Sequence, residues 1–226
     1  MRIFNRSYLK TFIFEQKCIP CRVKKQYYLF RNKIFNINTK KYWDNVWLAE
    51  ANNIPEHRFH PLLFEKIVSM VPCKSKILEL GCGLGILLEK LKNNNECGVF
   101  GIDFSEEAID FIRSKKLQGM TAKVPPINLS SNSFDVAIAI ELLEHINNQN
   151  ELLREMYRVT KPNGFLIIAV PDNTLHPDQK REHVSIFDER KLYKLMLKLK
   201  LKEIEIVRIQ EKEPEKIFRL IVKGKK

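Results

Sequence analysis

The chain has 226 residues, enough for one domain with an extension and for a sizeable buried core. Its composition, 44% hydrophobic and 29% charged, is typical of a soluble globular protein. No apolar run approaches the ~20 residues that a membrane helix needs. The N-terminus is basic, but Lys10 and Glu15 interrupt the apolar residues that follow it, which is not the pattern of a secretory signal, so we expect a cytoplasmic protein.

The net charge of +12 is concentrated near the N-terminus. Residues 1–41 contain 11 Lys and Arg but a single acid, Glu15, with aromatic residues interleaved among them. Such a segment suits RNA or an anionic membrane surface, and it equally suits a basic arm that packs on its own domain with its lysines solvated. We therefore divide the chain into a basic aromatic extension, 1–41, and a nearly neutral domain, 42–226.

The five cysteines are odd in number and include one C-x-x-C pair, Cys18 and Cys21. No second pair stands at the spacing of a zinc finger. In a reducing compartment an isolated pair of this kind is most often two thiols, so we assign it no metal or redox role.

Two helices are expected before the first strand. Lys41–Glu50 is a short amphipathic segment that carries the aromatic pair Tyr42 and Trp43. A second helix follows from Leu62 and ends before Pro72. Such an early helix can close over a ligand of the domain, although core packing is the more ordinary role of these aromatic residues.

Residues 76–85 form the most informative stretch, Lys-Ile-Leu-Glu-Leu-Gly-Cys-Gly-Leu-Gly. Ile77–Leu80 predicts a short buried strand, and apolar residues at helical spacing from Ile86 onward predict a helix directly after the glycines. Glycines let a ligand approach the backbone closely, and the N–H groups of the new helix favour a negative ligand group. The dinucleotide fingerprint G-x-G-x-x-G fails because position 86 is Ile.

Strands and helices alternate through the rest of the chain. Asp103 stands at the tip of a second buried strand, Cys97–Ser105, where a carboxylate can accept both hydroxyls of a ribose. Ser105 can cap the next helix. The later elements predicted are strands at Met120–Ala122, Ser133–Ile140 and Phe165–Pro171, helices at Glu151–Thr160 (stopped by Gly164) and Glu189–Leu199, a polar loop Asp172–Asp188 with His176 and His183, and two strands at Ile204–Ile209 and Phe218–Val222. This order predicts an α/β fold, a doubly wound, mostly parallel seven-stranded sheet with a terminal antiparallel hairpin.

Five of these segments, in this order, resemble motifs of the class I S-adenosylmethionine (SAM) methyltransferases over about residues 54–222. They are Glu79–Gly85, Gly101–Ser105, Asn132–Val136, Glu144–Ile146 and Arg158–Gly164. The resemblance implies a Rossmann-like fold, methyl transfer and SAM as cofactor. The cofactor-binding residues that it implies are Glu79, Gly81, Cys82, Gly83, Gly85, Asp103 (ribose) and Phe104 (adenine). Lys123, Pro125 and Pro126 depart from the family, because an acid usually stands there and bonds the adenine amine.

Three titratable residues follow the fourth strand. If a helical turn starts at Glu141, the spacing i, i+3, i+4 places Glu141, Glu144 and His145 on one face beside the methyl donor. We expect His145 and Glu141 to be catalytic and to take the proton of the acceptor. With His183, the set also resembles ubiquinone-pathway O-methyltransferases and small-RNA 3′-terminal 2′-O-methyltransferases, in which it gathers a divalent metal. Because a Glu-His-Ile helix start is common across the superfamily, the sequence alone assigns no metal.

The sequence thus predicts a SAM-dependent methyltransferase that moves a methyl group to an oxygen (or nitrogen) of a small or lipid-linked metabolite. One alternative is an RNA methyltransferase that uses the basic extension, and another is a non-catalytic SAM-fold regulatory protein. For the extension we favour a membrane surface over RNA, because the nearly neutral domain offers no continuing basic track. No motif names the acceptor or the oligomeric state.

Overall fold

A computed structural model describes residues 32, 34–54, 60–172, 182–211 and 217–226. The predictions for residues 1–31, for Cys18 and Cys21, and for His176 lie outside the described residues.

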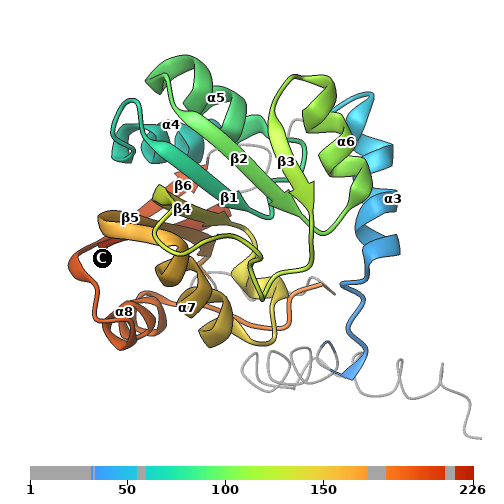
Figure 1. The fold of residues 1–226 in the computed structure, drawn as a ribbon. Coiled ribbons are helices and arrows are strands. Elements are labelled where there is room, and N and C mark those ends of the chain that lie inside the picture. Colours follow the sequence, from blue (N-terminus) through green and yellow to red (C-terminus); the bar gives the residue numbers. More distant parts are fainter. Residues whose placement is uncertain (1–31, 33, 55–59, 173–181, 212–216) are drawn as a thin grey trace, which may run out of the picture.

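The described strands form one seven-stranded sheet with the order β3-β2-β1-β4-β5-β7-β6 (Figure 1). The five strands β1 to β5 run parallel, whereas β7 is antiparallel to both β5 and β6. The strands are β1 (Lys76–Leu80), β2 (Gly98–Asp103), β3 (Gln118–Thr121), β4 (Phe134–Ile140), β5 (Thr160–Pro171), β6 (Lys202–Glu211) and β7 (Ile217–Lys225). The predicted doubly wound sheet and its terminal antiparallel pair are confirmed.

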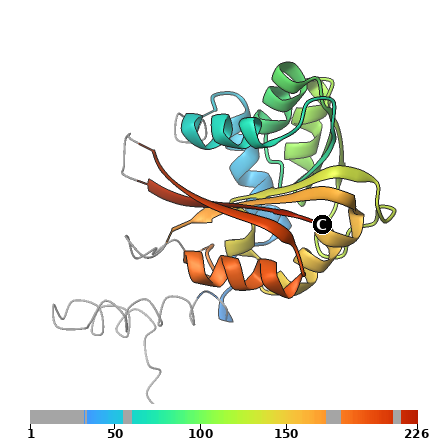
Figure 2. The same ribbon diagram turned by 90° about the vertical axis from the view of Figure 1, so that its left-hand side faces the viewer.

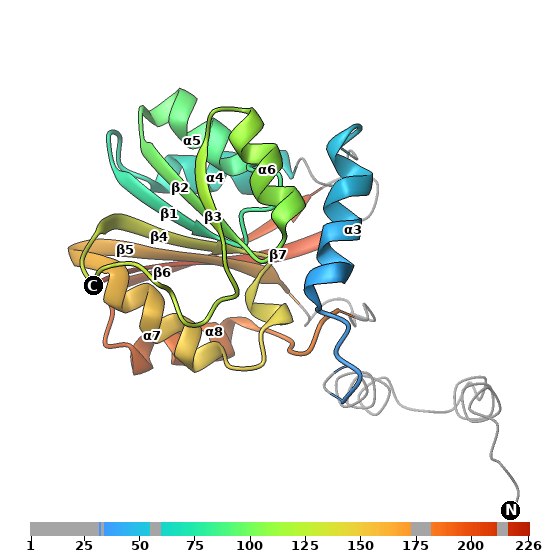
Figure 3. The same cartoon turned by 45° about the vertical axis from the view of Figure 1, so that its right-hand side comes forward.

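Helices cover both faces of the sheet. Figure 2 shows α4, α5 and α6 on one side and α7 and α8 on the other, while Figure 3 shows α3 running alongside α6. The helices are α3 (Lys40–Ala51), α4 (Pro61–Met70), α5 (Ile86–Asn95), α6 (Glu106–Ser114), α7 (Gln149–Val159) and α8 (Glu189–Lys198), with a short 3₁₀ helix, η2 (Leu143–His145). Ser105 caps α6 as predicted, since its Oγ accepts from the N–H of Ala108 at 3.3 Å.

The central strands are buried on both faces. Ile77 and Ile138 pack with α4 and α5, whereas their neighbours Leu78 and Ala137 pack with α7 and α8, and all four are fully buried. Successive side chains of a strand point to opposite faces, so a sheet covered on both sides needs apolar residues at every position. This is the reason that β4 is apolar from Val136 to Ile140 and that Glu79 is the one polar residue between Ile77 and Leu80 of β1.

The prediction that Gly164 stops the helix before β5 was wrong. The helix α7 ends at Val159, and Thr160 is already extended and begins β5. Within the Lys-Pro-Asn-Gly turn the left-handed residue is Asn163, with φ of 63°. Gly164 is needed for close packing instead, because a Cβ there would lie 2.6 Å from the carbonyl oxygen of Asp135.

Candidate active site

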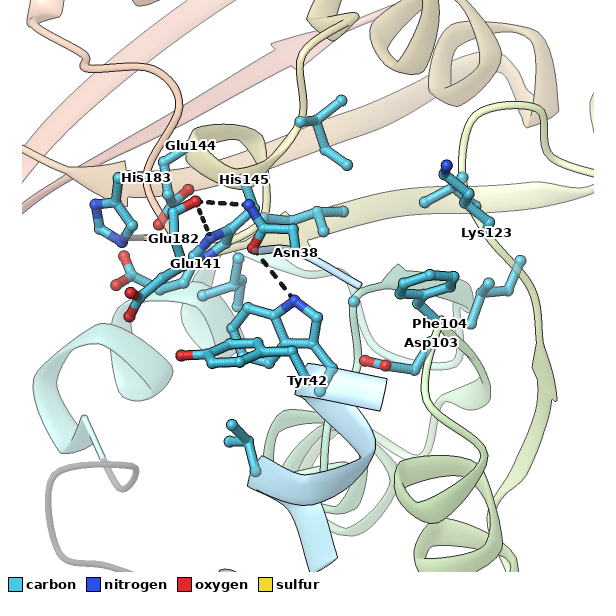
Figure 4. Close-up of a pocket in the computed structure, with 18 of the residues that line it drawn as sticks. Asn38, Tyr42, Asp103, Phe104, Lys123, Glu141, Glu144, His145, Glu182 and His183 are labelled. Carbon is cyan, nitrogen blue, oxygen red and sulfur yellow. Dashed lines mark hydrogen bonds between the residues drawn. The ribbon is translucent and has the colours of Figure 1, made fainter. Parts of the chain in front are cut away.

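A cavity of about 660 Å³ lies at the carboxyl ends of the parallel strands. The strand order reverses at β1, which has β2 on one side and β4 on the other, and this is where α/β sheets bind ligands. The helix α3, the loop around Glu182 and the strand β7 complete the wall. Figure 4 shows Asp103, Phe104 and Lys123 in one part of the cavity and a group of glutamates and histidines in another.

The glycine segment forms the floor of the first part. Gly81, Gly83 and Gly85 have φ of 70°, 48° and 69°, which residues with a Cβ rarely adopt. The N–H of Gly83 donates to Asp103 Oδ2 and the N–H of Ser105 donates to Asp103 Oδ1, both at 2.9 Å. Burial raises the pKa of Asp103 and these backbone hydrogen bonds oppose the shift. The carboxylate is therefore held at the tip of β2, where it lines the cavity.

The structure places the predicted cofactor residues in two groups. Gly81, Asp103 and Phe104 line the cavity, as do Lys123 and Pro125 from the loop after β3. The end of β1 and the loop behind the cavity hold the others, Glu79, Cys82, Gly83 and Gly85.

Glu79 is the second carboxylate of this region. It is 4% exposed, and its Oε2 has no hydrogen-bond partner among the described residues. Burial, and then the charge of Asp103, raise the pKa of Glu79 well above its ordinary value. Glu79 does not line the cavity, whereas Gly81, Asp103 and Phe104 do, and the Asp103 carboxylate at the tip of β2 suits the ribose hydroxyls of SAM, so the residues present fit this cofactor.

The helix α3 covers the glycine segment. A Cβ on Gly83 would lie 2.8 Å from the ring of Trp47, so this tryptophan rests directly on the loop. Asp44 fastens α3 to α6, because its Oδ1 accepts from Ser105 Oγ at 2.6 Å and from the N–H of Glu106 at 3.0 Å. Burial acts to raise the pKa of Asp44, but hydrogen bonds from Ser105 and Lys40 lower it overall.

The second part of the cavity contains a group of possible metal ligands. Glu144 and His145 of η2 and His183 of the later loop each present one ligand atom, and these atoms lie within 4.8 Å of one another. The Nδ1 of His145 lies 3.1 Å from the carbonyl oxygen of Glu182, so Nδ1 donates to that oxygen and Nε2 is the ring nitrogen left for a ligand. The N–H of Val184 donates to the carbonyl oxygen of Glu144 at 2.8 Å, which ties the loop to η2.

The helical turn predicted from Glu141 is not formed. Glu141 has a left-handed φ of 49° and its N–H pairs with Ala169 of β5, while η2 begins only at Leu143. Glu141 therefore does not share one face with Glu144 and His145. Both Glu141 and His145 line the cavity, and their catalytic role stays a prediction.

Sequence reasoning missed several residues of the cavity wall. Asn38 donates through Nδ2 to the carbonyl oxygen of Glu182 at 2.7 Å, and its Oδ1 accepts from Trp43 Nε1 at 3.3 Å. The buried Arg219 of β7 also lines the cavity. These residues belong to no motif, and the one sequence signal for Arg219 is a charge inside an alternating apolar strand.

The domain boundary at residue 41 stays a prediction, although Asn38 precedes it and contacts Glu182 in the loop beside the cavity.

Comparison with known proteins finds similarity to methyltransferases. A methyltransferase domain family matches residues 78–168. A ubiquinone biosynthesis O-methyltransferase from Pelagibacter ubique is 30% identical over 146 residues, which cover 57% of this chain and 60% of that protein. A tRNA (carboxymethyluridine(34)-5-O)-methyltransferase from Arabidopsis thaliana is 28% identical over 172 residues, 74% of this chain and 41% of that protein. The chain thus spans about 40% to 60% of the length of these relatives.

Solved structures share the fold. A chain of the complex between the Haloferax volcanii Trm112 methyltransferase activator and a methyltransferase has a TM-score of 0.69 at 17% identity, over 81% of this chain and 96% of that chain. A SAM-dependent methyltransferase from Thermotoga maritima gives a TM-score of 0.60 at 18% identity, over 80% and 99% of the two chains.

The sheet and its flanking helices define a Rossmann-like domain with the fold of SAM-dependent methyltransferases. Together with the match of the methyltransferase domain family over residues 78–168, they support a class I SAM-dependent methyltransferase domain with SAM as its cofactor. Within the described residues, none of the helices has the length and apolar character needed to cross a membrane.

Proposed function

We propose that this protein transfers the methyl group of SAM to a hydroxyl oxygen of a small or lipid-linked acceptor, and that Glu144, His145 and His183 hold a divalent cation beside that oxygen. The observation that carries the proposal is the grouping of two imidazoles and one carboxylate within 4.8 Å in the part of the cavity away from Asp103. Nitrogen and oxygen ligands of this kind suit zinc and other first-row divalent metals. Both relatives described above are named as O-methyltransferases, which supports an oxygen acceptor.

Methyl transfer from SAM does not require a covalent bond between the protein and either substrate. SAM is an activated donor, so the chain has to align the acceptor oxygen with the S–CH₃ bond and exclude water. Asp103 and the glycine segment would hold the cofactor from one side, and Trp47 of α3 packs on the glycine segment beside it. A divalent cation at the cluster would lower the pKa of the acceptor hydroxyl and fix its position. The carbonyl oxygen of Glu182 orients the His145 ring through Nδ1, and Nε2 is then the nitrogen that would bind a cation or accept a proton.

Two measurements test the proposal. Calorimetry should show SAM binding by the wild type, and no binding at millimolar SAM would refute the enzyme assignment. A Mn²⁺ or Zn²⁺ titration should then show one site that His183→Ala weakens at least tenfold, whereas Glu107→Ala, on the exposed face of α6, leaves it unchanged. A methyl-transfer screen with phenolic compounds should be sensitive to chelator, and full activity in chelator would refute the cation.

RNA is the second candidate acceptor. The basic residues of 1–41 and the tRNA methyltransferase among the relatives favour it. If the extension binds polyanions, affinity for RNA or anionic vesicles falls steeply with salt, because neutralised phosphates release counterions. Mobility shift with tRNA and vesicle co-sedimentation, each at two salt concentrations, separate these partners. Failure of both assays would indicate a basic arm that serves only its own domain.

A further inference from the structure

We infer that Asn32 and Asn38 are positioning residues for the two histidines of the proposed cation site, because their side-chain amides hold the peptide groups on both sides of His183 and, through one of these groups, the ring of His145. This inference rests on the proposed function. It extends the site to residues that precede the domain boundary expected at residue 41.

Asn38 holds the carbonyl group that orients His145. Its Nδ2 donates to the carbonyl oxygen of Glu182 at 2.7 Å, and the Nδ1 of His145 lies 3.1 Å from the same oxygen. Figure 4 shows these two bonds meeting at the loop. A carbonyl oxygen has two lone pairs, so it can accept from both donors at once. Asn38 thereby fixes the oxygen against which the His145 ring is oriented.

Asn32 holds the next carbonyl group of the chain. It is 3% exposed, and its Nδ2 donates to the carbonyl oxygen of His183 at 2.8 Å. On the following residue, the N–H of Val184 donates to the carbonyl oxygen of Glu144 at 2.8 Å. Residues 183–186 belong to no helix or strand, so no regular element fixes the direction of the His183 imidazole. These hydrogen bonds therefore do so, in the way that groups behind metal ligands orient them.

Trp43 connects the amide of Asn38 to both imidazole rings. Its Nε1 donates to Asn38 Oδ1 at 3.3 Å, and its ring centroid lies 5.1 Å from that of His145 in an edge-on arrangement. The His145 ring lies 4.9 Å from the His183 ring, also edge-on. Asn38 thus uses both halves of its amide, the NH₂ group for Glu182 and the oxygen for Trp43. An apolar side chain of the same size would form neither bond.

The test measures by calorimetry the Mn²⁺ and Zn²⁺ affinities of the full chain and, separately, its SAM affinity. Asn38→Leu and Asn32→Leu, which have similar volumes but no amide, should each bind the cations at least tenfold more weakly. Asn38→Gln keeps the amide and should bind them at least threefold more tightly than Asn38→Leu. SAM affinity should stay within twofold of the wild type in all three variants. Asn53→Leu, at an exposed position after α3, is the matched control and should change neither affinity.

The outcomes separate the inference from the proposed function. If the wild type binds neither cation, the proposed function fails and the inference fails with it. If the wild type binds a cation and folded Asn38→Leu binds it equally well, the proposed function stands and the inference is overturned. Parallel losses of cation and SAM affinity, or no gain in Asn38→Gln over Asn38→Leu, would also overturn it, because the side chains would then act only through general stability. Circular dichroism checks folding, and the partly buried Asn38 decides the question even if Asn32→Leu does not fold.

Discussion

The two parts of the cavity are built in different ways. The part around Asp103, here called the cofactor part, comes from one continuous stretch, β1 with its glycine loop, and from the tip of the adjacent strand β2. The part around Glu144, His145 and His183, here called the acceptor part, is lined by side chains from α3, η2, the loop at His183 and β7. These elements are far apart in the sequence (Figure 4). Backbone conformation decides the first part, whereas packing between distant elements decides the second. A substitution in one part should therefore change ligand binding in that part and leave binding in the other part unchanged.

The largest effect is expected for Gly83→Val. The residue has φ of 48°, and a Cβ would lie 2.8 Å from Trp47, so a branched side chain strains the loop and displaces α3. We expect SAM affinity to fall at least 100-fold, or roughly 3 kcal/mol, by calorimetry. Gly98→Val is the matched control, since a Cβ there meets nothing within 4 Å. Equal SAM affinity in both variants would contradict the assigned cradle.

Asp103→Ala should have the next largest effect on SAM binding. The carboxylate would bond the ribose hydroxyls, and its hydrogen bonds from Gly83 and Ser105 hold the loop in place. The expected loss is about 1–3 kcal/mol of binding free energy, because charge-assisted hydrogen bonds disappear. Asp110→Ala, at the exposed face of α6, is the control. Cation affinity at the acceptor part should not change in either variant, and a change would show that the two parts are not independent.

The smallest effect is expected for Asp44→Ala, which removes the fastening between α3 and α6. Loss of the contacts with Ser105 and Glu106 should destabilise the fold by about 1 kcal/mol at neutral pH. The folded pKa of Asp44 is lowered, so its contribution is present above the unfolded pKa of about 3.9 and is lost as pH falls through the folded value. The difference in Tm from the wild type should be constant from pH 7 to about pH 5 and then shrink. A difference that grows toward acid pH would contradict this origin.

The sequence by itself determined the sheet and the places of the glycine segment and Asp103 at the ends of β1 and β2. Continuous apolar strands, the glycines after β1 and Asp103 at the tip of β2 all act through local backbone geometry, which a short window of residues encodes. The sequence did not predict the arrangement of the acceptor part. Spacing alone placed Glu141 on one helical face with Glu144 and His145, but Glu141 has a left-handed backbone and forms an ion pair with Arg219, 78 positions later. Only the folded sheet brings β7 beside the end of β4, because long-range pairing decides which distant side chains meet.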